Sequence, residues 1–307
     1  MRAQICMSKA LMRSGHSESA SRLCGLLLAF VRFVAICLAL LSSLYALAFG
    51  ESSPNVSAKH GFVVFDGLLY RGKPDLRNRG LVPIAGSGNL WRPGVSTEGV
   101  DEVKIAAMFA PYRNSDGFYY LDIENWPLMS VTADVRLQNE KKLERVIDLA
   151  HRAAPHLRLG FYGILPTIVY WPLMRHDAEY LEWRSVNQQM DPLSNHVDAV
   201  FPSLYTFYSD LAGWKSYARQ TLIEARRYGK PVYAFLWPQF HDSNAELGGH
   251  EVPPEYWRAE LELCAELADG VVLWGGYQTP WDENAAWWRE TQSFMSAEHR
   301  DDSSGRQ

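Results

Sequence analysis

Short runs of apolar and β-branched residues recur along the chain, and segments with helical spacing separate them. Seven such runs lie at residues 61–66, 81–85, 117–122, 157–163, 199–204, 231–236 and 270–274. The stretches at 197–201 and 270–274 are apolar at nearly every position, which is typical of strands covered on both faces. Strands that alternate with helices in this way predict a parallel sheet joined by crossover helices.

Helical spacing is clearest at Leu143, Val146, Ile147 and Ala150, which fall at i, i+3, i+4 and i+7. They predict a helix over residues 139–154, and further helices are predicted at residues 180–189, 214–228, 255–267 and 283–295. The chain is therefore predicted to be α/β, with a single TIM-like (β/α) barrel of about seven parallel strands over residues 49–295. The polar residues 296–307 are predicted to be a disordered tail.

Residues 1–48 differ in composition from the rest of the chain. Five Lys and Arg residues against one acidic residue, Glu18, precede an apolar run, and Ala46-Leu47-Ala48 offers the small residues that a signal peptidase recognises. Cleavage after this site would give a secreted or periplasmic protein. Residues 25–49 are also long enough to remain as a membrane anchor, so a signal peptide and an anchor are both open, and a membrane is a partner only with the anchor.

Composition limits the partners of the barrel. Removing the five basic residues and the one acidic residue of the leader from the totals leaves 25 basic and 34 acidic residues, a net charge of −9. Such a domain repels polyanions, so nucleic acid is not expected as a partner. The barrel keeps one cysteine, Cys264, predicted to be a core thiol, and the sequence has neither a phosphate-binding glycine pattern nor a His pair with metal-ligand spacing. No cofactor and no metal are predicted.

Functional groups of a parallel barrel gather at the carboxyl ends of its strands. The residues at the predicted strand ends are mostly acidic or aromatic: Asp122, Glu124, Trp126, Tyr162, Tyr205, Trp237, Gln239, His241, Trp274, Tyr277 and Gln278. Carboxylates surrounded by aromatic rings are typical of a sugar site, because aromatic faces stack on the apolar faces of pyranoses. For any single ring, the alternative is packing against the following helix. His241 and His250 flank a glycine-rich loop and are predicted to be surface residues.

Asp122 and Glu124 form the candidate catalytic pair. An extended backbone places them on one face, about 6 to 7 Å apart at ~3.3 Å per residue. Two carboxylates this close do not ionise independently, and burial among Tyr119, Tyr120 and Trp126 favours Glu124 as the member that keeps its proton. A protonated Glu beside an ionised Asp has the properties of a general acid with an electrostatic partner. The alternative is a solvated, idle pair after a strand.

The segment Asp122-Ile-Glu124-Asn-Trp126 resembles the Asp-x-Glu-x-Trp motif of the hyaluronidase-type glycoside hydrolases. Further segments resemble the family in the same order: Gly160-Phe-Tyr162 with Pro166 downstream, Phe201-Pro-Ser-Leu-Tyr205 with Phe207, Pro231-Val-Tyr-Ala-Phe235, and Gly270-Val-Val-Leu-Trp274-Gly275. The resemblance spans about residues 60–290 and implies an irregular barrel of seven strands.

The resemblance also implies roles for individual residues. Glu124 would protonate the glycosidic oxygen and later activate water, while Asp122 would orient the acetamido group of an N-acetylhexosamine, whose carbonyl oxygen acts as the nucleophile. This is a retaining, substrate-assisted route to cleavage of a polysaccharide that contains N-acetylhexosamine. Tyr205 would assist the acetamido group and Trp274 would line the sugar subsite. The other predicted substrate-binding residues are Tyr162, Trp126, Tyr170 and Trp237.

Departures from the family pattern keep other functions open. Val169 stands where the family has a tyrosine, with Tyr170 one position later, and the family's disulfides are absent. A non-catalytic glycan-binding barrel is therefore one alternative. An inverting glycosidase acting on another sugar is a second, because the carboxylate spacing touches the ~6.5 Å lower bound of inverting pairs. The polymer could be hyaluronan, chitin-like, peptidoglycan-derived or an exopolysaccharide.

Overall fold

The computed structural model describes residues 61–175 and 177–304, and the side chains of these residues as far as residue 297. The predictions for the leader, residues 1–48, lie outside the described residues. Within the two described ranges, none of the helices combines the length and the apolar content that crossing a membrane requires.

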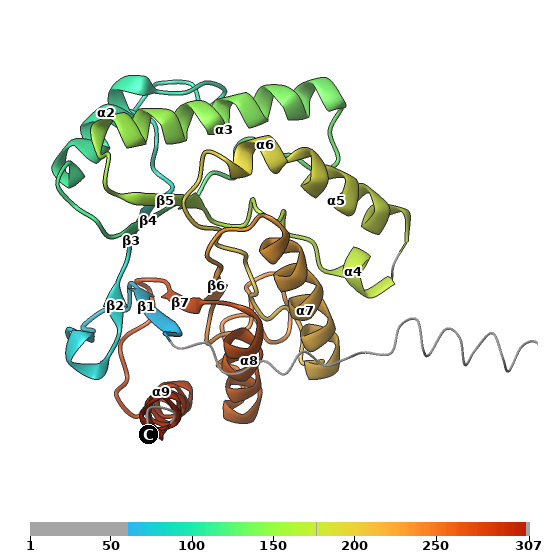
Figure 1. The fold of residues 1–307 in the computed structure, drawn as a ribbon. Helices are drawn as coiled ribbons and strands as arrows, with labels where there is room; N and C mark the ends of the chain where they lie inside the picture. The colour runs from blue at the N-terminus through green and yellow to red at the C-terminus, as the bar shows by residue number, and fades with distance from the viewer. Residues whose placement is uncertain (1–60, 176, 305–307) are drawn as a thin grey trace, which may run out of the picture. The chain divides into compact units, whose positions relative to one another are not determined.

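The described strands pair in parallel throughout, in two sheets (Figure 1). One sheet has the order β2-β1-β7-β6 and the other β3-β4-β5. Their bounds are Val63–Leu68 (β1), Val82–Pro83 (β2), Ala85–Ser87 (β3), Phe118–Leu121 (β4), Arg158–Phe161 (β5), Tyr233–Leu236 (β6) and Gly270–Gly275 (β7). Ile84 alone separates β2 from β3, so one chain segment pairs first with β1 and then with β4.

The predicted strand at residues 199–204 is present only as isolated bridges. Phe201 pairs with Tyr162, Val200 pairs with Val232 just before β6, and Ser203 pairs with Phe235 in β6. Pro202 has no N–H to donate, which interrupts a regular ladder at this point. The predicted α/β barrel of parallel strands is confirmed, and it is irregular: continuous ladders do not close it, and the 199–204 segment links the two sheets.

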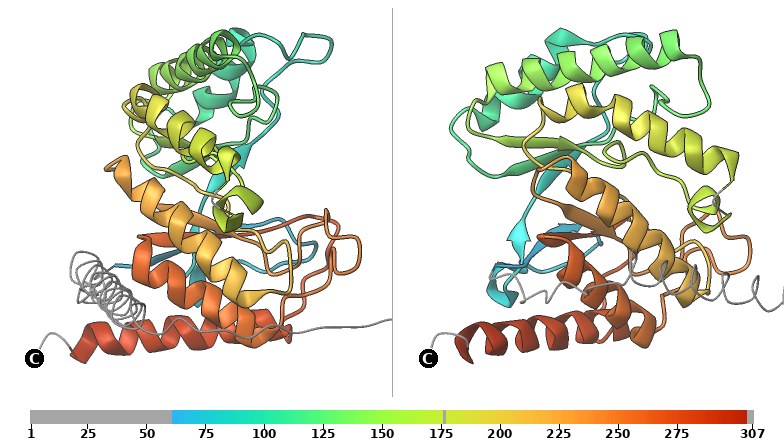
Figure 2. Two further views of the ribbon diagram at one scale, coloured as in Figure 1. Left: turned by 90° about the vertical axis from the view of Figure 1, so that its right-hand side faces the viewer. Right: turned by 45° about the vertical axis from the view of Figure 1, so that its right-hand side comes forward.

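Helices connect the strands and cover their outer faces (Figure 2). Those longer than five residues are α2 (Glu102–Phe109), α3 (Ala133–Ala153), α5 (Ala178–Gln189), α7 (Leu211–Arg227), α8 (Pro254–Leu267) and α9 (Ala286–Ser304). The short ones are α4 (Trp171–Arg175), α6 (Asp191–Ser194), η1 (Arg77–Arg79) and η2 (Ala110–Tyr112). Thr132, Asp177 and Asp210 cap α3, α5 and α7, because their side chains accept the otherwise unpaired N–H groups of the first turn. The five predicted helices are confirmed as α3, α5, α7, α8 and α9.

The prediction of a disordered tail from residue 296 is wrong for residues 296–304, where α9 continues. Phe294 and Met295 are buried, and the Phe294 ring meets Phe62 edge-on at 5.7 Å between centroids. This packing anchors the helix, and the polar residues beyond it extend the helical hydrogen bonding. Polarity alone was therefore a poor guide to disorder at this position.

The strands divide their side chains between two clusters, as the pleat requires. On β6, Tyr233 and Phe235 belong to an inner aromatic cluster, whereas Ala234 and Leu236 face the core beneath the helices. On β4, Tyr120 faces inward and its ring lies over Gly86, where an added Cβ would come within 2.2 Å of it. The interior of the barrel is thus filled by large rings, and glycine on a neighbouring strand makes room for them.

Candidate active site

Asp122 continues the inward face of β4 one residue after the strand ends. Its N–H donates to the Ser87 carbonyl oxygen at 3.2 Å, which holds it beside the end of β3. Gly88 lies so close that an added Cβ would be 3.0 Å from the Asp122 carbonyl oxygen. Within the described part of the chain, the Asp122 Oδ1 atom is buried and has no hydrogen-bond partner. A buried carboxylate oxygen at the carboxyl-terminal end of the barrel is therefore left unsatisfied among the described residues.

Burial raises the pKa of Asp122 to about 6, and the charge of Glu124 adds to the rise. The expectation that Glu124 would be the buried, proton-retaining member of the pair is corrected, because Glu124 is exposed. The strand ends at Leu121, and the loop that follows buries Ile123 while Glu124 faces solvent. The two carboxylates thus differ in burial, as predicted, but Asp122 is the buried member and Glu124 is the exposed one.

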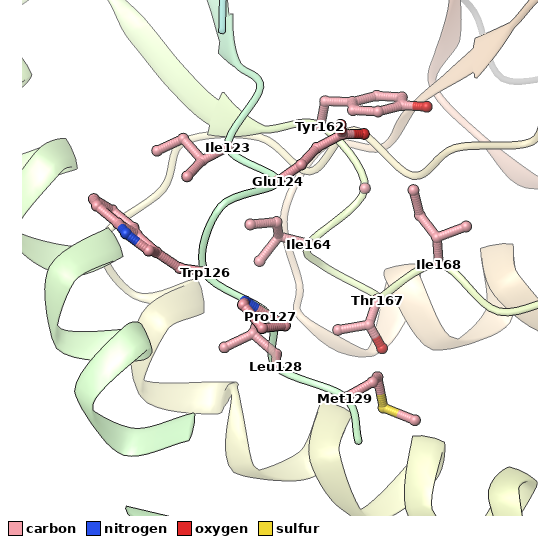
Figure 3. Close-up of a pocket in the computed structure, with 11 residues that line it drawn as sticks. Ile123, Glu124, Trp126, Pro127, Leu128, Met129, Tyr162, Ile164, Thr167 and Ile168 are labelled. Carbon is pink, nitrogen blue, oxygen red and sulfur yellow. The ribbon is translucent and has the colours of Figure 1, made fainter. Parts of the chain in front are cut away.

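Glu124 faces a pocket of about 260 Å³ at the end of the strands. Figure 3 shows its side chain directed toward Tyr162, which lines the same pocket. The charge of Glu124 acts on the pKa of Tyr162 and of His241, so both rings lie within its electrostatic reach. An exposed carboxylate in a pocket, with a buried carboxylate behind it, can exchange protons with a bound molecule.

Tyr162 and Tyr205 carry two hydroxyl groups into the same region. The Tyr162 hydroxyl donates to Ser203 Oγ at 3.0 Å, and the two tyrosine rings lie 5.7 Å apart. Burial raises the pKa of both tyrosines, and the negative charge of Asp122 adds to the effect on each. Both hydroxyl groups therefore stay protonated near neutral pH and can donate hydrogen bonds.

Tyr205 also joins the aromatic residues at the ends of β6 and β7. Its ring centroid lies 5.6 Å from that of Trp237 and 5.7 Å from that of Trp274, and the two indoles meet edge-on at 4.9 Å. Trp274 is half-buried, whereas Trp237 is buried. The structure thus brings Asp122, Tyr162, Tyr205, Trp237 and Trp274 together, as the sequence predicted.

His241, predicted to be a surface residue, is half-buried, whereas His250 is exposed as predicted. His241 stacks on Tyr205 at 6.1 Å and lies 4.8 Å from Phe207, and burial lowers its pKa. The backbone N–H of His241 donates to the Thr206 carbonyl oxygen at 2.8 Å, which holds the loop after β6 beside the aromatic cluster. The sequence did contain a signal for this position of His241, namely the alternation of Trp237, Gln239 and His241 beyond the end of the predicted strand.

Trp126, a predicted substrate-binding residue, lines the same pocket as Glu124, although its ring is largely buried. The Trp126 indole N–H donates to the Thr97 carbonyl oxygen at 2.8 Å, and Trp91 packs edge-on against the ring at 5.5 Å. Figure 3 shows the Trp126 ring on the side of the loop away from Tyr162. Tyr170, also predicted to bind substrate, lies 5.2 Å from Trp171 and 5.2 Å from Tyr208, and Phe207, 5.8 Å from Tyr170, links this group to His241.

Metal-binding groups are not clustered in the part of the chain that the structure describes: no three His, Cys, Asp or Glu side chains are placed to hold an ion. Cys264 is a buried free thiol, as predicted.

Two solved structures of one enzyme are similar in fold to this chain. Bee venom hyaluronidase aligns at a TM-score of 0.54 and 14% identity, covering 78% of this chain and 97% of that one. The same enzyme in complex with a hyaluronic acid tetramer aligns at 0.55 and 15% identity, covering 76% and 95%. Neither a protein-family model nor a curated protein sequence matches the chain. At this identity the likeness shows the fold, which is an irregular (β/α) barrel.

Proposed function

We propose that this protein is a glycoside hydrolase that cleaves a polysaccharide containing N-acetylhexosamine. The observation that carries the proposal is the carboxylate pair after β4: an exposed Glu124 in a pocket, and a buried Asp122 whose Oδ1 lacks a partner among the described residues. A substrate that supplies an N–H donor to Asp122 would satisfy that acceptor, and an acetamido group carries such a donor. Support also comes from bee venom hyaluronidase, which shares the fold and has been solved with a hyaluronic acid tetramer.

The proposed reaction follows the substrate-assisted, retaining route. In the proposed step, Glu124 reacts in its acid form and gives this proton to the glycosidic oxygen as the bond to the anomeric carbon breaks, while the acetamido carbonyl oxygen forms a new bond to that carbon. The Glu124 carboxylate then takes a proton from water, which opens the cyclic intermediate and restores the enzyme. Asp122 holds the acetamido N–H, and the Tyr205 hydroxyl supports the acetamido group.

The half-buried indole of Trp274 and the ring of Trp237 would form the wall of the subsite for this sugar, because aromatic faces stack on pyranoses. Tyr162 would connect this subsite to the pocket that Glu124 faces.

Glu124→Gln tests the proposal. The variant is expected to lose glycan cleavage by about 10² to 10⁴, which is the usual contribution of a positioned proton donor, and to keep its unfolding temperature. The measurement is turnover on a panel of N-acetylhexosamine polymers, with Glu179→Gln, an exposed glutamate on α5, as the control. Full activity in Glu124→Gln would exclude the proposal.

Two other outcomes would point to the alternative functions. Binding of glycans without turnover by the wild-type protein would indicate a non-catalytic barrel. Inversion of the anomeric configuration in the first product, read by NMR, would indicate an inverting glycosidase that needs no acetamido nucleophile.

We also propose that the leader exports the protein. Cleavage after Ala48 would give a secreted or periplasmic chain that begins at Phe49, whereas an uncleaved leader would anchor it in a membrane. The intact mass of the protein recovered from membrane and non-membrane fractions separates the two.

A further inference from the structure

The pocket beside Glu124 has a part that the proposed catalytic roles do not use. Beyond Glu124 and Tyr162, its walls are apolar side chains from the loop after β4 and from the segment after β5 (Figure 3). These side chains are Ile123, Trp126, Pro127, Leu128, Met129, Ile164 and Ile168, and Thr167 adds one polar group. A volume of about 260 Å³ is a little below the ~300 to 1,000 Å³ of sites for drug-sized ligands, and gives room for roughly one sugar ring.

Of the residues that the structure describes, Glu124 is the single charged side chain that lines this pocket. Among the polar groups of the wall, Thr167 already bonds to Asn187 Oδ1, through its N–H at 3.0 Å. Arg175 packs over the Trp171 ring at 5.1 Å and does not line the pocket. A uronate in this place would meet a carboxylate and apolar walls, and its desolvation would not be compensated by a cation.

Tyr162 connects the pocket to the aromatic rings at the ends of β6 and β7. Tyr162 lines the pocket and also contacts Tyr205, and Tyr205 leads on to Trp237 and Trp274. With the acetamido-bearing sugar held between Asp122 and those rings, Glu124 stands at the scissile bond. The sugar that enters the pocket is then the one on the leaving-group side.

We propose that this pocket is a binding subsite for an uncharged sugar on the leaving-group side, with an apolar ring face or an acyl methyl group against Ile164 and Ile168. The inference rests on the proposed function for the orientation of the chain, and it sharpens the substrate. The polymer is a neutral one, such as a homopolymer of N-acetylhexosamine, rather than one in which uronates alternate.

The test compares chitopentaose with a hyaluronan oligosaccharide of similar length on the full chain. Wild-type kcat/KM is expected to favour chitopentaose by at least about tenfold. Ile168→Lys, at a side chain that is 40% exposed and so tolerant of change, places a cation at the pocket. It is expected to lower kcat/KM for chitopentaose by about tenfold and to narrow or reverse the preference. Ile223→Lys, on α7 and 59% exposed, is the matched control.

A binding measurement keeps the subsite separable from catalysis. Titration calorimetry on the Glu124→Gln chain, with and without Ile168→Lys, reports the Kd of both oligosaccharides even when turnover is absent. Turnover of none of the N-acetylhexosamine polymers in the panel would exclude the proposed function, while chitopentaose binding that Ile168→Lys weakens and Ile223→Lys preserves would still support the subsite. A preference for the hyaluronan oligosaccharide would overturn the proposed subsite. Values of kcat/KM and Kd that Ile168→Lys leaves equal to those of its parent would also overturn it.

Discussion

At the scale of single residues, Asp122 combines a destabilising environment with a central place in the site. Its Oδ1 is buried without a hydrogen-bond partner among the described residues, and its pKa is raised to about 6. Burying a charge that lacks hydrogen bonds costs free energy, which the rest of the fold offsets. Such groups persist where a ligand completes them, and this is the reason that Asp122 rather than Glu124 carries the argument for an acetamido group.

Asp122→Asn should therefore stabilise the empty protein near neutral pH. The raised pKa means that the folded state holds this proton between about pH 4 and 6 while the unfolded state has lost it, so the stability of the wild type falls as pH rises through that range. Above it, the variant should gain on the order of 1 kcal/mol, a value discounted for partial solvent exposure. Urea unfolding at pH 4 and pH 7.5 measures the difference.

The control for this prediction is Asp116→Asn, at an exposed aspartate in the turn before β4. Its stability should follow that of the wild type at both pH values. Lower stability of Asp122→Asn than of the wild type at pH 7.5 would contradict the interpretation of Asp122 as an uncompensated charge.

At the scale of elements, close approach between β5 and the 199–204 segment depends on Gly160. A Cβ at this position would lie 2.2 Å from the Ala199 carbonyl oxygen and 2.8 Å from the Phe201 ring. Gly160→Ala should therefore destabilise the protein by about 1 to 3 kcal/mol, the range for overpacked sites, since backbone must shift to admit the methyl group. The free energy of unfolding measures it.

Gly117→Ala offers a matched comparison, because a Cβ there would have no neighbour within 4 Å. It should change the stability by no more than about 0.5 kcal/mol, as is usual for surface substitutions. Equal effects of the two substitutions on the free energy of unfolding would mean that β5 and the 199–204 segment can move apart without loss of stability.

The sequence predicted helices and strands well where the periodicity of apolar residues was strong. It predicted them poorly where tertiary contacts determine the conformation of a segment. The apolar runs located β6 and β7 to within two residues at each end, but the 199–204 run is reduced to bridges around Pro202. Two of the helices that were not predicted, α4 and α6, have five and four residues, too few to show a helical period.

For the site, strand ends predicted the gathering of Asp122, Tyr205 and Trp274, because parallel strands end at one side of a barrel. The pocket was not predictable. Its wall at Ile164 and Ile168 depends on the path of a loop, and contacts such as the one from the Thr167 N–H to Asn187, distant in sequence, hold that path.

At the scale of the whole molecule, charge and the pocket point to the same substrate. The chain has 30 basic and 35 acidic residues, a net charge of −5. A like-charged polymer is repelled at long range, and it would then meet the carboxylate of Glu124 at the pocket. A neutral polymer is subject to neither effect. The net charge of the protein therefore favours a neutral polymer at long range, as the pocket is proposed to do at the leaving-group subsite.

The long-range repulsion of charged polymers predicts how binding responds to salt. Raising NaCl from about 10 to about 100 mM shortens the screening length from about 30 to about 10 Å, which weakens the repulsion. The Kd of hyaluronan oligosaccharides for the Glu124→Gln chain should therefore fall with added salt, while that of chitopentaose should stay constant. Hyaluronan binding that weakens with added salt would contradict this prediction, because it would mean that a local basic surface outweighs the net negative charge. Chitopentaose is the control: a change in its Kd would indicate a general effect of salt on the fold rather than screening.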